Sequence, residues 1–127
     1  MRVDVFVPTI STEEQVRFYV QELGLFAVGQ DYGMGSILLR HVDSPSFCIL
    51  LQPGRAPSID RPLFCMSTAN CRSEFARLLS LSFEKGGLVP APDGSVQVFE
   101  YPLGESISLK DASGNLFVIA EWHPNAF

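Results

Sequence analysis

The stretch LKDASGNLFVIAEW, residues 109–122, contains a polar turn followed by an apolar strand. The turn Asp-Ala-Ser-Gly-Asn ends at Asn115, and the five residues that follow, 116–120, carry no charge. A strand with one solvated face alternates apolar and polar residues, whereas a strand that is apolar on both faces is covered on both sides. The sequence therefore raises the question of what lies against the face that carries Val118 and Ala120.

The composition suits one globular domain. The chain has 127 residues, 46% of them hydrophobic, which is enough for a single domain with its own core. Its three cysteines form no Cys-x-x-Cys pair, and reduced thiols of a cytoplasmic protein are the simplest interpretation. The net charge of −5 argues against a nucleic-acid partner, because a phosphate backbone is bound by a basic surface. No apolar run approaches the length of a membrane span, so we expect no membrane partner.

The first half of the chain predicts a strand, a helix and three further strands. Residues 3–8 form a short β-rich run. Residues 11–24 predict a helix that Ser11 caps together with Glu14 and that Gly24 ends. Gly, Asp and Pro residues separate the three strand candidates, which lie within residues 25–33, 35–43 and 47–54.

The second half repeats this order of elements at a period of roughly sixty residues. Residues 71–87 predict a helix that Asn70 caps. The strand candidates of this half lie within residues 62–68, 95–104, 106–111 and 115–122. We therefore predict an α+β fold with two tandem βαβββ modules, residues 1–54 and 62–127, joined by a linker over residues 55–61. The modules would form curved mixed sheets around a hollow, with the helices outside.

Two motifs resemble the vicinal oxygen chelate superfamily, which includes glyoxalase I, extradiol dioxygenases, fosfomycin-resistance enzymes and bleomycin-resistance proteins. In the first helix, Phe18-Tyr19 and Leu23-Gly24 match the usual helix signature of the superfamily. The opening stretch is similar to its Asp-Pro-Asp-Gly-Asn hairpin, with matches at Asp111, Gly114, Asn115 and Leu116 and departures at Ala112 and Ser113. The resemblance covers essentially the whole chain, but a fold alone does not choose among these functions.

The resemblance implies positions for a divalent metal on the inner faces of the sheets, where relatives carry His, Glu or Gln. In this chain the positions fall on Asp4, Ile49, Leu63 and Val118. A catalytic zinc or iron site needs about three nitrogen, oxygen or thiolate ligands from the protein. Shifting each register by one residue adds only Cys48. The usual metal site is therefore missing from the sequence, and we expect no metal, no cofactor and no catalytic residue.

An apolar hollow is the expected replacement for the metal site. Val118 would line it where relatives place a metal-binding carboxylate, and Asp4 would supply a polar anchor. The predicted ligand-binding residues are Asp4, Phe6, Ile49, Leu51, Leu63, Cys65 and Val118. For each apolar side chain, filling an ordinary core is the alternative interpretation, and for Asp4 the alternative is simple exposure to solvent.

The other reactive side chains give weaker signals. His41 and His123 have no spacing typical of metal ligands and are interpreted as surface residues. No histidine base can be placed near Cys65 from the sequence, so a structural thiol is favoured over a nucleophile. Glu100 lies in a strand whose register the sequence does not fix.

These observations favour a metal-free protein that resembles the bleomycin-resistance group and sequesters a small molecule, either a drug or a metabolite. The alternative is a divergent metal-dependent lyase, isomerase or dioxygenase that uses Asp4, His41 or Glu100 in new positions. An interaction module with a filled interior and no ligand is a third interpretation. Because the predicted sheets have exposed edges that invite pairing, we also expect a two-fold homodimer.

Overall fold

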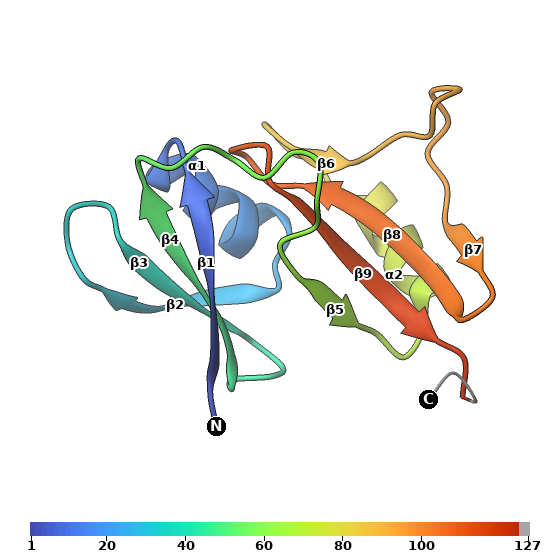
Figure 1. The fold of residues 1–127 in the computed structure, drawn as a ribbon, viewed down its shortest axis with the longest axis horizontal. Coiled ribbons are helices and arrows are strands. Elements are labelled where there is room, and N and C mark those ends of the chain that lie inside the picture. The colour runs from blue at the N-terminus through green and yellow to red at the C-terminus, as the bar shows by residue number, and fades with distance from the viewer. Residues whose placement is uncertain (125–127) are drawn as a thin grey trace.

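The computed structural model describes residues 1–124, which form two mixed β-sheets (Figure 1). The N-terminal sheet has the order β1 (Val3–Thr9), β4 (Phe47–Pro53), β3 (Ile37–His41) and β2 (Phe26–Asp31). The C-terminal sheet has the order β5 (Cys65–Ser67), β9 (Leu116–Trp122), β8 (Gly104–Lys110) and β6 (Gly87–Leu88), with β7 (Phe99–Tyr101) also paired to β8. The first strand of each sheet is parallel to its neighbour and the remaining pairs are antiparallel. The predicted α+β class and the two curved sheets are confirmed.

The first helix forms as its end signals predict. Helix α1 (Thr12–Val16) begins where the Ser11 hydroxyl accepts a hydrogen bond from the Glu14 N–H, 3.3 Å. It continues as a π-helical segment, η1 (Arg17–Glu22), and Gly24 follows with a φ of +74°, a conformation that favours glycine.

The second helix is shorter than predicted. Helix α2 (Cys71–Leu79) is capped by Asn70 as expected, since the Asn70 Oδ1 accepts from the Ser73 N–H at 2.9 Å. It ends eight residues before the predicted position, because the Ser80 and Leu81 N–H groups bond three residues back and tighten the last turn. The chain then returns to pair Gly87 and Leu88 with β8, a short strand that the sequence did not predict. No helix within residues 1–124 has the length and apolar character needed to cross a membrane.

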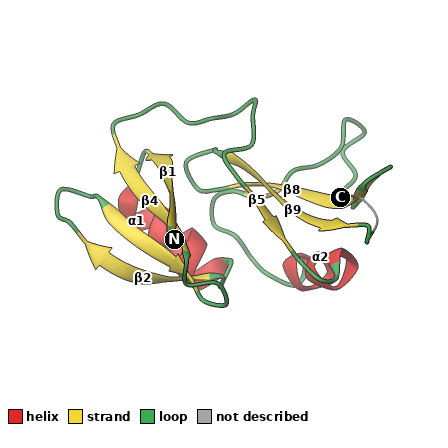
Figure 2. Ribbon diagram, turned by 60° about the horizontal axis from the view of Figure 1, so that its bottom comes forward, coloured by secondary structure: helices red, strands yellow, loops and turns green. Residues whose placement is uncertain are grey.

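In each half, the helix covers one face of its own sheet (Figures 1 and 2). The side chains on the two covered faces pack into one shared core. Five aromatic rings, four of them buried in this core and one packed against it, contact one another in a closed circuit with neighbouring centroids 5.1–6.2 Å apart. They are Tyr19, Phe26, Phe47, Phe64 and Phe117. Because Phe64 and Phe117 belong to the C-terminal half and the others to the N-terminal half, the circuit joins the two halves.

The two sequence motifs contact each other through the buried carboxylate of Asp111, which is 1% exposed. Its Oδ2 accepts hydrogen bonds from the Tyr19 hydroxyl at 2.7 Å and from the Gln15 Nε2 at 3.0 Å. Burial and the negative charge of Asp111 raise the pKa of Tyr19 well above its ordinary value, so the phenol stays a donor. The helix that carries the first motif is therefore hydrogen-bonded directly to the hairpin that carries the second.

The rest of the hairpin is hydrogen-bonded to the C-terminal end of β1 and to the residue that follows it. Asp111 also accepts from the backbone N–H groups of Ser113 and Asn115, at 3.0 and 2.9 Å. The Asn115 Nδ2 donates to the Pro8 carbonyl at 2.6 Å, and the Ser113 hydroxyl accepts from the Ile10 N–H at 2.9 Å. Ser113, one of the two departures from the superfamily pattern, thus supplies its own contact between the halves.

Candidate functional site

The register of the N-terminal sheet separates the predicted ligand-binding residues into two groups. Asp4 pairs with Cys48 and Phe6 pairs with Leu50, on the face that points away from the helices, called here the open face. Ile49 and Leu51 pair with Val5 and Val7, so they lie on the opposite face and are fully buried in the core.

Successive side chains of a strand point to opposite faces, so a count that is off by one residue moves a side chain across the sheet. The expectation that Phe6, Ile49 and Leu51 share one hollow is therefore corrected by the register. Cys48, not Ile49, is the β4 residue beside Asp4.

The C-terminal sheet answers the question raised by the opening stretch. Phe117 and Ile119 face the core, whereas Val118 lies on the open face and is only half-buried. Val118 pairs with Cys65 of β5 and with Ser108 of β8, so the three side chains share that face. The face that carries Val118 is thus partly exposed to solvent. The strand carries apolar side chains on both faces, but only the face with Phe117 and Ile119 is fully covered.

The superfamily metal positions do not fit a metal ion. The Asp4 carboxylate is bound by the Arg2 guanidinium through two contacts, Nε to Oδ1 at 2.9 Å and Nη2 to Oδ2 at 3.0 Å. Ile49 is on the other face of its sheet, and Leu63 and Val118 offer no donor atoms. Among residues 1–124 no three His, Cys, Asp or Glu side chains converge in the manner of metal ligands. Glu100, a candidate of the alternative interpretation, accepts instead from Arg72 at 2.6 Å.

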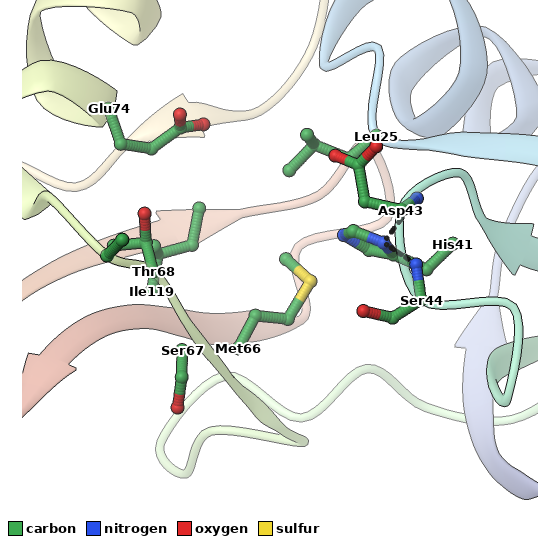
Figure 3. Close-up of a pocket in the computed structure, with 10 residues that line it drawn as sticks. Leu25, His41, Asp43, Ser44, Met66, Ser67, Thr68, Glu74 and Ile119 are labelled. Carbon is green, nitrogen blue, oxygen red and sulfur yellow. Dashed lines mark hydrogen bonds between the residues drawn. The ribbon is translucent and has the colours of Figure 1, made fainter.

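A hollow lies where the loop between β3 and β4 meets β5, and it is called here the junction hollow (Figure 3). It has two adjoining parts of about 250 and 270 Å³, which share His41, Ser44, Met66 and Ser67. Phe47 and Cys65 complete one part. The other part extends to Leu25, Asp43, Thr68, Ala69, Glu74 and Ile119. Of the seven predicted ligand-binding residues, only Cys65 lines this hollow.

His41 has a fixed orientation in the junction hollow. Its Nδ1 accepts hydrogen bonds from the backbone N–H groups of Asp43 and Ser44, both at 3.1 Å. A ring nitrogen that accepts carries no proton, so the proton of the neutral ring is on Nε2. The ring packs edge-on against Phe26, with centroids 5.3 Å apart, and Figure 3 shows its far side directed into the hollow. His41 therefore presents an N–H donor to whatever occupies this space.

The stability of the fold is expected to fall as the pH drops below about 6.5, the ordinary pKa of histidine in an unfolded chain. Burial lowers the pKa of folded His41, against an opposing effect of Asp43, so the unfolded state binds more protons in the window between the two pKa values. The stabilisation by neutral His41 is complete above the unfolded pKa and is lost as the pH falls through that window. Because the ring is only partly buried, the effect stays well below ~1.4 kcal/mol per pH unit.

Urea unfolding between pH of about 8 and about 5 checks this expectation. The His41→Gln variant has no titrating ring at this position, so its unfolding free energy should depend less steeply on pH than that of the wild type. Equal slopes for the two proteins would contradict the assignment of the effect to His41.

Sequence reasoning missed most of the junction hollow. His41 was interpreted as a surface residue, and Asp43, Ser44 and Met66 carry no motif. The hollow forms only when a hairpin loop near residue 43 meets a strand that begins at Cys65 in the other half of the chain. No periodicity within either segment signals that contact.

Solved structures share the architecture of this chain, although no protein-family profile and no curated protein matches its sequence. TnmS3, an antibiotic binding protein from Streptomyces sp. CB03234, is 17% identical and has a TM-score of 0.72 over 97% of this chain and 96% of its own. The bleomycin-binding protein of bleomycin-producing Streptomyces verticillus, complexed with copper(II)-bleomycin, is 14% identical with a TM-score of 0.71, and each chain is covered to 97%. The fosfomycin resistance protein FosX of Listeria monocytogenes is 8% identical with a TM-score of 0.66, over 97% of this chain and 91% of its own. The chain therefore has the glyoxalase/bleomycin-resistance fold, the fold of the vicinal oxygen chelate superfamily that its two motifs predicted.

Proposed function

We propose that the protein binds a small molecule, a drug or a metabolite, without a metal ion and without transforming it. The observation that carries this proposal is the junction hollow, which combines an apolar wall from Leu25, Met66 and Ile119 with the fixed N–H donor of His41. A few placed polar groups on an apolar lining are typical of small-molecule sites. Two solved structures of the same fold are named for binding an antibiotic and bleomycin, which supports the same class of function here.

The open faces beside the hollow extend the proposed binding surface. Cys65 connects the hollow with the open face of the C-terminal sheet, because it lines the hollow and shares that open face with Val118. Asp4 and Phe6 lie on the open face of the other sheet. Leu63 packs at the margin of the core, and Ile49 and Leu51 lie within it. Ligand contact therefore remains proposed for Cys65, Val118, Asp4 and Phe6, and a role in shaping the core is proposed for the other three.

Ligand binding is expected to be independent of metal. In a thermal-shift panel of antibiotics that includes bleomycin, a bound compound at about 100 times its Kd adds ~2.7 kcal/mol and raises the Tm by about 10 °C. The shift should be the same after treatment with EDTA and after addition of zinc. Native mass spectrometry of freshly purified protein should show no stoichiometric metal. A retained zinc, iron, manganese or nickel ion whose removal abolishes binding would support the metal-dependent enzyme instead.

A variant that fills the hollow tests its location. Cys65 is exposed at the mouth of the hollow, so Cys65→Trp should reduce ligand binding while leaving the fold intact. Ile59→Trp places the same bulk on an exposed position of the linker and serves as the matched control. If no compound of the panel shifts the Tm of the wild type, the interaction module without a ligand becomes the better interpretation.

We also propose a homodimer in the cytoplasm. Phe6 is 56% exposed on the open face of the N-terminal sheet, and Tyr101 is 43% exposed on the open face of the C-terminal sheet. Large apolar side chains gathered on uncovered sheet faces are typical of protein interfaces. A two-fold dimer is the commonest way in which soluble proteins cover such a surface.

Sedimentation equilibrium at micromolar concentration is expected to give twice the chain mass of 14.0 kDa. Phe6→Glu introduces a charge on the open face and should shift the equilibrium to the monomer. Ile59→Glu adds the same charge to the exposed linker and should leave the dimer unchanged. A single species near 14.0 kDa for the wild type contradicts the proposed dimer.

A further inference from the structure

The polar groups of the junction hollow are arranged on opposite walls. Figure 3 shows the His41 ring and the Asp43 carboxylate on one side and the Glu74 carboxylate on the other, with the Met66 side chain below and between the two sides. The His41 Nε2 offers a donor, because Nδ1 is already used as an acceptor by two backbone N–H groups. The carboxylates offer only acceptors. A ligand that satisfies both walls needs an acceptor near His41 and a donor near the acidic groups.

The charge of the lining favours a cationic donor. Two of the ten residues around the first part of the hollow are acidic, and none is Lys or Arg. Glu74 is partly neutralised, since Arg77 donates to its Oε1 from Nε at 3.0 Å and from Nη2 at 2.6 Å. Asp43 has no such partner among the ion pairs of residues 1–124. Asp43 is therefore the main uncompensated charge at the hollow.

The apolar wall defines the rest of the ligand. Leu25 packs against the core, Ile119 belongs to it, and Met66 supplies a polarizable thioether that packs well against aromatic rings. The adjoining part of the hollow adds Phe47 and Cys65. An aromatic or branched apolar group fits this lining better than a second charged group, which would be desolvated without a partner.

We infer that the junction hollow binds an amine, specifically a compound that carries a protonated amino group and a neighbouring hydroxyl or carbonyl on an apolar body. The ammonium group lies between Asp43 and Glu74, the oxygen accepts from the His41 Nε2–H, and the apolar body lies against Met66, Leu25 and Ile119. This assignment rests on the proposed small-molecule binding and adds the chemical class of the ligand.

Three probes of one size and different charge test the assignment. Phenylethanolamine, phenylethylene glycol and mandelate share a phenyl ring and a hydroxyl group but end in an ammonium, a hydroxyl and a carboxylate. In NMR titrations the amine should bind about tenfold more tightly than the glycol, and mandelate should bind more weakly than the glycol. The shift changes should be centred on the methyl groups of Leu25, Met66 and Ile119. Added salt should weaken binding of the amine and leave the glycol unaffected.

Matched variants separate the charge of Asp43 from the charge of the whole protein. Asp43→Asn should reduce the affinity for the amine about fivefold and leave the affinity for the glycol unchanged. Asp60→Asn removes the same charge from an exposed position of the linker and should change neither affinity. His41→Phe should reduce the affinities for the amine and for the glycol by the same factor, because it removes the N–H donor that both compounds use.

The amine assignment is overturned if the glycol binds as tightly as the amine, if the Asn variants at 43 and 60 behave alike, or if none of the three probes shifts the hollow methyl signals. The proposed function has its own readout in the antibiotic panel. If a compound of the panel shifts the Tm but the hollow shows no preference for the amine in the NMR titrations, the proposed small-molecule binding is supported and only the amine class of the ligand is refuted.

Discussion

Replacing Asp111 by Ala is expected to lower the unfolding free energy by at least ~4 kcal/mol. The substitution removes one buried carboxylate and leaves the Tyr19 hydroxyl and the Gln15 Nε2 without their acceptor, while the Asn115 Nδ2 loses one of its two acceptors and keeps the Pro8 carbonyl. The backbone N–H of Asn115 loses its acceptor as well, and the backbone N–H of Ser113 keeps only the Gln15 Oε1 at 3.2 Å. Each buried donor that stays unsatisfied costs about 1–3 kcal/mol, and only some can turn to other partners. Urea unfolding followed by circular dichroism measures the loss.

Asp93→Ala is the matched control. Asp93 also accepts two hydrogen bonds, from the backbone N–H and the hydroxyl of Ser95, but it lies on the surface, where water replaces them. Its loss should cost less than ~1 kcal/mol. If the two variants lose the same amount, the carboxylate of Asp111 does not hold the halves together.

A double-mutant cycle isolates the contact between the two motifs. Tyr19→Phe alone removes one hydrogen bond to a charged group and should cost about 1.5–3 kcal/mol. In an Asp111→Ala background, the same change should cost much less, because the Tyr19 hydroxyl has no carboxylate left to bind. Additive effects of the two substitutions would contradict a direct contact.

The fold could be predicted from the sequence because its signals are local. Ser11 and Asn70 mark helix starts through contacts with residues three positions further on, and Gly24 marks a helix end through its positive φ. The Asp-Ala-Ser-Gly-Asn turn is also recognisable from its own sequence, since the backbone N–H groups of Ser113 and Asn115 donate to the carboxylate of its first residue, Asp111. Local chemistry of this kind is visible in any window of the sequence.

The candidate site could be predicted only in part, because it depends on register and on contacts between the halves. The hydrophobic run of β4 is apolar on both faces, so its pattern does not distinguish Ile49 in the core from Leu50 on the open face. The turn residues Asp43 and Ser44 orient His41, but nothing near them indicates that β5 lies opposite. The role of Ser113 in holding Ile10 was likewise hidden, because the two residues are far apart in the chain.

Replacing Phe117 by Ala is expected to destabilise the protein by about 3–5 kcal/mol. Its ring is fully buried and lies 5.1 Å from the ring of Phe64 and 5.8 Å from that of Tyr19, at the point where the circuit of aromatic rings joins the two halves. Removing the ring leaves a cavity that the rigid neighbouring rings cannot fill. The midpoint of urea unfolding and the Tm should both fall.

Val118→Ala, one residue further along the same strand, provides the control for this second prediction. Val118 is half-buried on the open face, so losing two methyl groups there should cost less than ~1.5 kcal/mol in the single chain. A one-residue slip of β9 would exchange the two side chains between core and surface and would reverse the order of the two effects. The ratio of the two losses therefore measures the register directly. If the loss from Val118→Ala exceeds that from Phe117→Ala, the core side of the opening stretch carries Val118, and the assignment of Cys65 and Val118 to one ligand-facing surface fails with it.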